Sequence, residues 1–298
     1  MKPLVALIGC GRWGLNILRD LISLECKVVV VDPSIHSREA SPKMGALAAV
    51  ESLDEVGSID GAIVATPTCY HAEVIKQLLP LNIPVFVEKP LTTDIKEALY
   101  LASIAKNKLF VMDKWRYHPG VEALAQIVHS GILGSLLGIS LKRVGWGNSQ
   151  DDIDCVWTLA PHDLSIVLEI LGYIPPPRTA SSEKDGDSFI SMTGFLGEKP
   201  WVIFEVSARS AKKQRLVRIH CEKGIASLYD FDDARIQLLM ESTDSSESEE
   251  RWLPISSEQP LLRELKAFLS YLKGGPCPKS SALDGAKIVE TIAELRRF

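Results

Sequence analysis

The sequence lacks the features that mark several classes of protein. No segment approaches the roughly 20 uninterrupted apolar residues of a membrane span, and the short apolar start leads into a glycine turn rather than a cleavage site. The net charge of −5 gives no electrostatic reason to expect nucleic acid or an anionic membrane surface as a partner. The six cysteines are scattered without a C-x-x-C pair, which favours reduced thiols over a disulfide framework or a zinc site. We therefore expect a cytoplasmic protein with no membrane, nucleic-acid or metal partner.

The sequence does contain enough apolar residues for two domains of ordinary size. Its 298 residues are 46% hydrophobic and 24% charged, a composition typical of soluble globular proteins. The pattern of apolar runs changes after Tyr117. We therefore predict one domain over residues 1–117 and a second over residues 118–298.

The first domain opens with a glycine-rich turn between two apolar runs. Leu4–Ile8 reads as a buried strand, and Gly9, Gly11 and Gly14 follow it in G-x-G-x-x-G spacing. These glycines allow a tight turn, a close approach of the backbone to a pyrophosphate and close helix packing. A helical pattern and a second apolar run follow, closed by Asp32, where a carboxylate would accept hydrogen bonds from an adenosine ribose. The segment predicts a dinucleotide site.

Strand and helix patterns alternate through the rest of the first domain, which predicts a doubly wound parallel sheet. Three further short strands are expected at Gly61–Ala65, Pro84–Val87 and Leu109–Met112. The loops at the carboxyl ends of parallel strands lie on one edge of the sheet, beside the cofactor. These loops are Gly9–Gly14, Asp32, Ala65–Thr68, Glu88–Pro90 and Asp113–Arg116.

The second domain reads as α+β with a mostly antiparallel sheet, because several strand-like runs from about Ser188 onward are joined by short turns. The polar stretch Glu241–Glu250 is expected to be a solvated hairpin tip or a loose loop. The first strand of this domain is expected at Leu136–Val144. Helices are expected at Pro119–Ser130, Ala160–Leu171, Pro260–Leu272 and Asp284–Arg297.

Two residues are candidates for proton transfer. Lys89 directly follows a buried strand on the cofactor edge, where it could exchange a proton with a substrate hydroxyl; the alternative is a surface lysine paired with Glu88. His162 is placed at the start of a helix, where the dipole favours a neutral, hydrogen-bonding ring; the alternative is a capping or packing histidine. Asp163 is expected to complement the charge of the same helix start.

Five segments together resemble one enzyme family. They are GCGRWG at Gly9–Gly14, ATPTCYH at Ala65–His71, EKPLTTD at Glu88–Asp94, WRYHPG at Trp115–Gly120 and LAPHDLSIVLEILG at Leu159–Gly172. The five segments occur in the same order as in one family. The chain therefore resembles the glucose–fructose oxidoreductase/inositol dehydrogenase/MocA (Gfo/Idh/MocA) family of nicotinamide-dependent oxidoreductases. Within it the pattern is most similar to members that act on nucleotide-linked sugars.

The resemblance implies roles for individual residues. Lys89 matches the family's catalytic lysine, whose bond to the following proline is often cis, and His162 matches its active-site histidine. The implied cofactor-binding residues are Gly9, Gly11, Arg12, Trp13, Gly14, Asp32, Thr66, Pro67, His71 and Glu88. Separately from the resemblance, position near the expected domain junction makes Arg116, Tyr117, Arg143, Trp146 and Asn148 candidate substrate residues, and Thr158 is added to them. The alternative for Arg143 and Trp146 is that they are plain features of a strand end. Relatives usually oligomerise through the exposed face of the second domain's sheet, which implies a homodimer or homotetramer.

Thr158 departs from the family pattern, because many of its dehydrogenases carry an aspartate four residues before the histidine. A threonine hydroxyl can hydrogen-bond but cannot act as a general base at neutral pH. Lys89 and His162 would then move the proton without a carboxylate between them, or the reaction differs. Asp113, at the end of the fifth strand, is a candidate substitute.

The residues after the second strand favour NAD over NADP. Asp32 would repel a 2′-phosphate, Pro33 and Ser34 add no cation beside it, and Arg38 lies several residues further on. The sequence therefore predicts an NAD-dependent dehydrogenase or reductase acting on a hydroxyl or keto group of a sugar, cyclitol or nucleotide-linked sugar. Two alternatives stay open: a non-catalytic dinucleotide-binding sensor, which the change at Thr158 would allow, and an imine or biliverdin-type reductase on the same fold.

Overall fold

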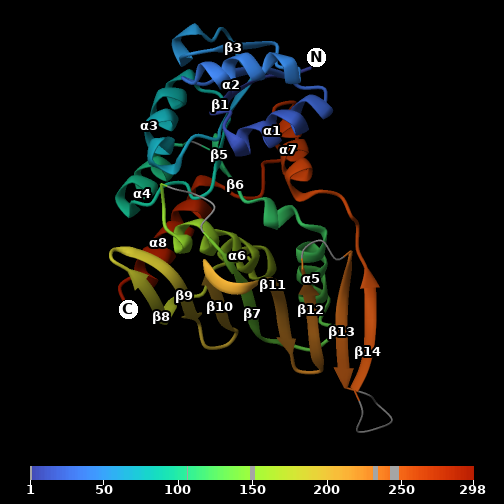
Figure 1. Cartoon of the computed structure of the whole chain (residues 1–298). Coiled ribbons are helices and arrows are strands. Elements are labelled where there is room, and N and C mark those ends of the chain that lie inside the picture. Colours follow the sequence, from blue (N-terminus) through green and yellow to red (C-terminus); the bar gives the residue numbers. More distant parts are fainter. Residues whose placement is uncertain (1, 106, 148–151, 231–233, 242–247) are drawn as a thin grey trace. The chain divides into compact units, whose positions relative to one another are not determined.

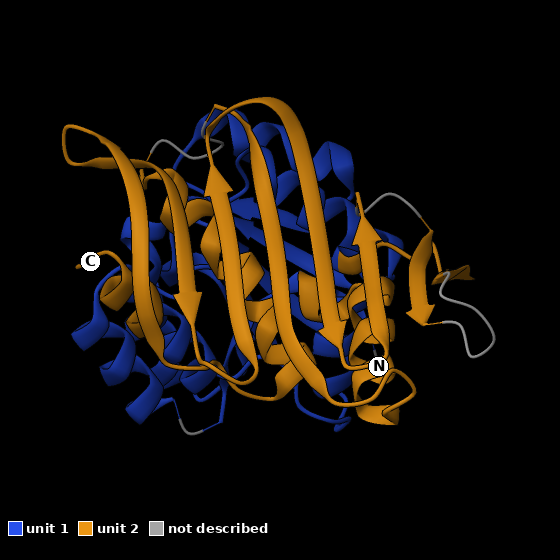
Figure 2. Ribbon diagram, turned by 90° about the horizontal axis from the view of Figure 1, so that it is seen from below, with its two compact units in different colours: residues 1–114, 261–289 blue, residues 115–260, 290–298 orange. Residues whose placement is uncertain are grey.

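The chain folds into two compact units in this computed structural model, which describes residues 2–105, 107–147, 152–230, 234–241 and 248–298. Unit 1 comprises Met1–Lys114 and Leu261–Val289, and unit 2 comprises Trp115–Pro260 and Glu290–Phe298 (Figure 2). The first division falls close to the predicted boundary after Tyr117. The C-terminal part divides differently from that prediction, because residues 261–289 group with unit 1.

Unit 1 is built on a six-stranded parallel sheet in the order β3-β2-β1-β4-β5-β6 (Figure 1). The strands are β1 (Leu4–Ile8), β2 (Lys27–Val31), β3 (Ala48–Val50), β4 (Gly61–Val64), β5 (Val85–Glu88) and β6 (Leu109–Met112). This order, which reverses direction between β1 and β4, is the doubly wound Rossmann arrangement, and it confirms the predicted fold class. The sequence prediction lacked β3, because this strand is only three residues long and half-buried.

Helices connect the strands of this sheet. They are α1 (Arg12–Ser23), α2 (Ile35–Ala40), α3 (Thr68–Leu78) and α4 (Ile95–Ile104). Residues 1–117 also contain four short 3₁₀ helices, which are η1 (Pro42–Met44), η2 (Leu53–Glu55), η3 (Leu79–Leu81) and η4 (Lys114–Tyr117). The apolar side of α1 buries Ile17, Leu18 and Leu21 in the core of unit 1.

The C-terminal part of the chain contributes α7 (Pro260–Tyr271) and α8 (Ala282–Leu295). The apolar side of α7 packs on the parallel sheet, where the ring of Phe268 stacks on that of Phe86 with centroids 4.9 Å apart. A Cβ added at Gly61 would lie 2.9 Å from the Leu272 side chain. This close packing explains why residues 261–289 belong to unit 1 rather than to unit 2.

Unit 2 is built on an eight-stranded sheet in the order β14-β13-β12-β11-β7-β10-β9-β8. The strands are β7 (Leu136–Trp146), β8 (Pro177–Asp185), β9 (Ser188–Leu196), β10 (Trp201–Ser207), β11 (Arg209–Cys221), β12 (Gly224–Tyr229), β13 (Arg235–Glu241) and β14 (Ser248–Pro254). All neighbours pair antiparallel except β7 and β10, so the predicted mostly antiparallel sheet is confirmed. The helices α5 (Pro119–Ser130) and α6 (Cys155–Leu171) belong to the same unit, as do residues 290–298.

The two ends of the stretch Glu241–Glu250 belong to β13 and β14, which pair antiparallel as the two sides of a hairpin, and residues 242–247 lie outside the described part. Two other local predictions for unit 2 were wrong. β8 lies before Ser188, where the first of the later strands was expected. The helix α6 begins at Cys155 instead of Ala160, because Asp154 caps it: its Oδ1 accepts from the backbone N–H groups of Val156 and Trp157 at 3.1 and 3.2 Å. Among the described helices of the chain, none combines the length and apolarity that crossing a bilayer requires.

Candidate functional site

The glycine turn lies at the carboxyl edge of the parallel sheet of unit 1. Gly9 has a φ of +89°, and a Cβ there would lie 2.8 Å from the backbone of Ala65 and Thr66 in the loop after β4. A Cβ at Gly14 would lie 2.3 Å from the carbonyl oxygen of Gly9. Gly11 is different, because a Cβ there would meet no atom within 4 Å. The turn is therefore tight on its protein side and open at Gly11, where α1 begins without a side-chain cap.

Asp32 is fixed directly after β2, beside this turn. Its Oδ2 accepts from the backbone N–H of Cys10 at 2.7 Å, and its Oδ1 accepts from that of Ser34 at 2.8 Å. Each carboxylate oxygen keeps further acceptor capacity, because an ionised carboxylate has about four lone-pair sites. Asp32 is thus held in one orientation and can still accept from the hydroxyls of a ribose.

His71 connects two loops of the same edge. The ring is buried, with Nδ1 2.9 Å from the carbonyl oxygen of Pro90 and Nε2 3.0 Å from that of Thr66. This arrangement holds the loops after β4 and β5 together, which gives His71 a positioning role at this edge. The Oγ1 atom of Thr66 is buried, and no partner for it appears among the described residues, so it is an orphaned polar atom beside the glycine turn.

Glu88 and Lys89 end β5 on this edge. The indole N–H of Trp13 donates to Oε1 of Glu88, and the backbone N–H of Lys89 donates to Oε2 at 3.2 Å. Burial raises the pKa of Glu88, while Lys89, Trp13 and Lys114 oppose that shift. Lys89 is only 8% exposed, and its bond to Pro90 is cis, as the resemblance implied.

Sequence reasoning missed Glu264, an acid of α7 that belongs to the same electrostatic group. It is fully buried, and no partner for either carboxylate oxygen appears among the described residues. Burial first, then the charges of Glu88 and Asp113, raise the pKa of Glu264 well above its ordinary value, while Lys114 opposes them. Its sequence signal is weak, because a glutamate in an amphipathic helix ordinarily faces water.

In unit 2 the structure corrects the environment of His162. The residue lies inside α6 rather than at its first turn, because the helix begins at Cys155 and continues through Pro161. The helix dipole therefore does not hold the ring of His162 neutral, since its effect is confined to the first turn. The ring of His162 is half-buried and lies edge-on to the ring of Trp115, with centroids 6.0 Å apart.

Asp163 does not complement a helix start either. It accepts a hydrogen bond from Nε of Arg143 at 2.8 Å, and both side chains are buried. The guanidinium of Arg143 also lies over the ring of Trp115, 4.9 Å from its centroid, and that of Arg215 lies 5.9 Å from the same centroid. Burial raises the pKa of Asp163, and Arg143 and Arg215 oppose it. Trp115 is thus the common neighbour of these cations and of His162.

The other predicted substrate residues occupy varied positions in unit 2. Arg116 pairs with Glu169 at 3.1 Å, and Tyr117 is buried. Trp146 is 80% exposed at the end of β7. The hydroxyl of Thr158 donates to the carbonyl oxygen of Asp154 at 2.9 Å, one turn back in α6. Asn148 lies outside the described residues.

The features of unit 1 define the class of protein. A tight glycine turn open at Gly11, an uncapped helix start, an anchored Asp32 and the orphaned hydroxyl of Thr66 together fit a dinucleotide. Within the described ranges, no group of three or more His, Cys, Asp or Glu side chains is arranged to hold a metal ion. Unit 1 is a Rossmann domain whose carboxyl edge fits a dinucleotide.

Comparison with known proteins gives the family. Residues 4–112 match the GFO_IDH_MocA profile, described as an oxidoreductase family with an NAD-binding Rossmann fold. The chain therefore carries the NAD-binding domain of the Gfo/Idh/MocA family, which confirms the resemblance. An inositol 2-dehydrogenase of Renibacterium salmoninarum is 29% identical over 143 residues, which make up 45% of this chain and 43% of that protein. The chain thus matches less than half the length of such curated relatives.

Solved structures extend the likeness of fold to the whole chain. The UDP-N-acetylglucosamine 3-dehydrogenase GnnA of Acidithiobacillus ferrooxidans superposes with a TM-score of 0.86 at 18% identity, over 100% of this chain and 97% of that one. A levoglucosan dehydrogenase in complex with NADH gives a TM-score of 0.88 at 15% identity, over 100% and 97%. At these identities the comparison establishes a shared architecture.

Proposed function

We propose that this protein is an NAD-dependent dehydrogenase or reductase that acts on a hydroxyl or keto group of a sugar, cyclitol or nucleotide-linked sugar. The observation that carries the proposal is the position of Lys89. This amine is almost wholly buried, yet it directly follows β5 on the same sheet edge as the dinucleotide turn. Relatives of this chain include an inositol 2-dehydrogenase, and proteins of the same fold include a UDP-N-acetylglucosamine 3-dehydrogenase.

The proposed chemistry assigns one task to each group of residues. Gly11, the start of α1 and Asp32 would hold the dinucleotide, and Thr66, Pro67 and Glu88 would line its nicotinamide end. A bound nicotinamide supplies the acceptor or donor of a hydride. In the oxidative direction the O–H bond of the substrate breaks and its proton passes to Nζ of Lys89. His162 of unit 2, whose ring lies edge-on to that of Trp115, keeps its proposed role of assisting this proton transfer.

The experiment that tests this proposal replaces Lys89. Purified protein is mixed with NAD⁺ and a panel of sugars, cyclitols and nucleotide-linked sugars, and formation of the reduced-nicotinamide absorbance band is followed. Lys89→Met should lower turnover of the active substrate by at least about 100-fold, because a general acid–base group contributes roughly that much. The affinity for NAD⁺ should stay within a few-fold of wild type.

The matched control is Lys96→Met, which removes an exposed lysine of α4 in the same unit. It should leave turnover unchanged. Tight binding of NAD⁺ without turnover of any compound would favour a non-catalytic dinucleotide-binding sensor. Turnover of imines or biliverdin-type compounds with NADH, but not of ketones, would favour an imine or biliverdin-type reductase. Unchanged turnover in the Lys89 variant would refute the proposed role of this residue.

The preference for NAD over NADP is part of the proposal. Asp32 presents a carboxylate where the ribose of the adenosine would lie, and a phosphate there would be repelled at short range. Direct binding of NAD⁺ and NADP⁺ to the wild-type protein, measured by calorimetry, tests the preference. We expect NAD⁺ to bind more tightly by at least about tenfold.

We further propose that the chain forms a homodimer or homotetramer in the cytoplasm. On the face of the unit 2 sheet opposite the buried Phe204, Phe195 and Ile203 pair on neighbouring strands. The same row continues through Ser140, Arg218, Ser227 and Gln237 to Trp252. A second copy would cover this mixed row and remove its apolar side chains from water. Sedimentation of wild type and of Ile203→Glu should give an oligomer and a smaller species, respectively.

A further inference from the structure

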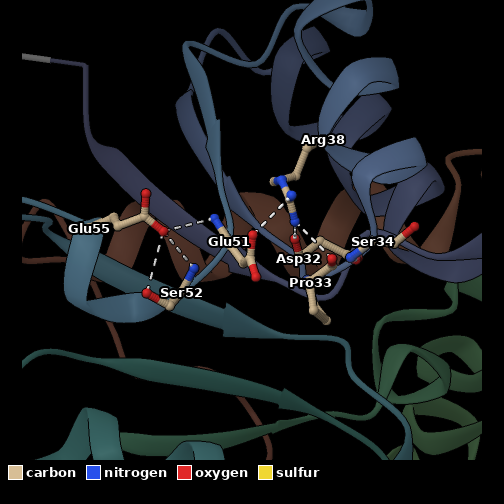
Figure 3. Close-up of polar contacts among 7 residues, drawn as sticks. All are labelled: Asp32, Pro33, Ser34, Arg38, Glu51, Ser52 and Glu55. Carbon is tan, nitrogen blue, oxygen red and sulfur yellow. Dashed lines mark hydrogen bonds and ion pairs between the residues drawn. The ribbon is translucent and has the colours of Figure 1, made fainter.

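The side chain of Arg38 is folded back against the backbone beside Asp32. Its Nη1 donates to the carbonyl oxygen of Asp32 at 2.9 Å and to that of Pro33 at 2.8 Å. Its Nη2 lies 3.0 Å from Oε2 of Glu51. Figure 3 shows the guanidinium between these groups, with the Asp32–Pro33–Ser34 loop on one side and Glu51 on the other. The guanidinium of Arg38, beside Asp32, is therefore engaged on two sides.

The position of Glu51 is set by the sheet and by a second acid. Glu51 directly follows β3, whose last residue Val50 pairs with Val31 at the end of β2. Oε1 of Glu55 accepts from the backbone N–H groups of Glu51 at 3.1 Å and of Ser52 at 3.0 Å (Figure 3). This cap fixes the turn after β3, so that Glu51 and Asp32 stand at the ends of neighbouring strands.

The ion pair has little value for folding. The side chain of Glu51 is 65% exposed and that of Arg38 is 21% exposed, and ion pairs with an exposed member contribute little to stability. The effect of the pair is instead to neutralise the charge of Arg38 and to fix the orientation of its guanidinium. Arginine is the residue best suited to bind phosphate, since its planar fork presents paired donors. In this site the fork faces a carboxylate and two carbonyl oxygens.

We infer that Glu51 is a cofactor-specificity residue, which withholds Arg38 from the 2′-phosphate of NADP. The preference for NAD over NADP then depends on two acids, Asp32 and Glu51, rather than on Asp32 alone. Asp32 repels the phosphate directly, and Glu51 occupies and neutralises the guanidinium that would otherwise bind it. The inference rests on the proposed function only in requiring that unit 1 binds a dinucleotide.

The experiment measures the dissociation constants of NAD⁺ and NADP⁺ by calorimetry for wild type, Glu51→Gln, Asp32→Ser and the double variant. Glu51→Gln should tighten NADP⁺ binding by about tenfold, as expected for one charge-assisted contact, and change NAD⁺ binding by less than about threefold. The double variant should gain more for NADP⁺ than either single variant. Because Glu51 is largely exposed, its amide should leave the fold intact, and the unchanged NAD⁺ affinity verifies this.

Two further variants separate the release of Arg38 from a general change of charge. Glu39→Gln removes an exposed acid from α2, the helix that carries Arg38, and should leave both affinities unchanged. Arg38→Met placed in the Glu51→Gln background should abolish the gain for NADP⁺.

Each outcome decides the inference. An equal gain from Glu39→Gln, or a gain that survives Arg38→Met, would mean that net charge and not Arg38 is responsible. No change in NADP⁺ affinity for Glu51→Gln would overturn the inference while leaving the dinucleotide site in place. Failure of the wild-type protein to bind either cofactor would instead refute the proposed function, so the two failures are distinguishable.

Discussion

Arg143 of β7 donates to Asp163 of α6 over 2.8 Å, with exposed side-chain fractions of only 5% and 2%. This buried ion pair joins the sheet of unit 2 to the helix that carries His162. Removing one member leaves the other as an uncompensated buried charge, which is far more costly than losing an exposed pair. The orientation of α6 therefore depends on a contact between residues on different elements.

The first prediction concerns this pair. Arg143→Met should lower the free energy of unfolding of unit 2 by about 3–5 kcal/mol, because Asp163 stays buried without its cation. Denaturant unfolding followed by tryptophan fluorescence measures the loss. Arg209→Met, which breaks the half-exposed pair with Glu183, is the control and should have little effect. Equal effects of the two substitutions would contradict the prediction.

The second prediction concerns pH and the buried Glu264. Its pKa in the folded protein is raised by burial and by Glu88 and Asp113, so the native state keeps a proton that the unfolded chain releases. Stability must then fall as the pH rises above about 4.3, the ordinary pKa of glutamate, towards the raised value. Glu264→Gln should flatten this decline.

The measurement is the denaturant midpoint of unit 1 across that range of pH. Lys114 opposes the shift of the Glu264 pKa, and Glu88 has a raised pKa of its own, so a smaller slope should remain in the Glu264 variant. Glu39→Gln, on the exposed side of α2, should keep the full slope. An unchanged slope in Glu264→Gln would show that this residue is ionised in the folded protein.

The geometry of the glycine turn and of Asp32 could be predicted from the sequence because its determinants are local. Gly9, Gly14 and Asp32 lie in one β–α–β segment, where close backbone approaches and backbone hydrogen bonds fix them. The position of Lys89 at the end of β5 was predicted in the same way, and its role in the reaction stays a prediction.

Other features depend on residues far apart in the chain and left no local pattern. The packing of α7 on unit 1, the pairing of Arg143 with Asp163 and that of Arg38 with Glu51 are long-range contacts. The misplaced start of α6 has a different cause. The periodic pattern predicted a start at Ala160, whereas the Asp154 cap lies earlier in the sequence and the helix continues through Pro161.

The third prediction concerns the hydrogen bond from Trp13 to Glu88. Trp13→Phe keeps an aromatic ring under Lys114, whose Nζ lies 4.2 Å from the ring centroid, but removes the N–H that Glu88 accepts. The free energy of unfolding of unit 1 should fall by about 1.5–3 kcal/mol, the usual value of a hydrogen bond to a charged group. Thermal and denaturant unfolding measure it. Tyr70→Phe, at an exposed position of α3 in the same unit, is the control and should change stability little.

The fourth prediction concerns Thr158, which stands where many relatives carry an acid. Its hydroxyl donates to the carbonyl oxygen of Asp154 within α6, and the residue is buried, so it is placed as part of the helix rather than as a carrier of protons. Thr158→Val keeps the branched shape and removes the hydroxyl. If Lys89 and His162 alone move the proton, turnover of the active substrate should stay within about threefold of wild type, far from the loss expected for Lys89→Met.

Steady-state kinetics on Thr158→Val and Lys89→Met measure the difference. A comparable loss in Thr158→Val, with the helix intact by circular dichroism, would give the hydroxyl a direct part in the reaction.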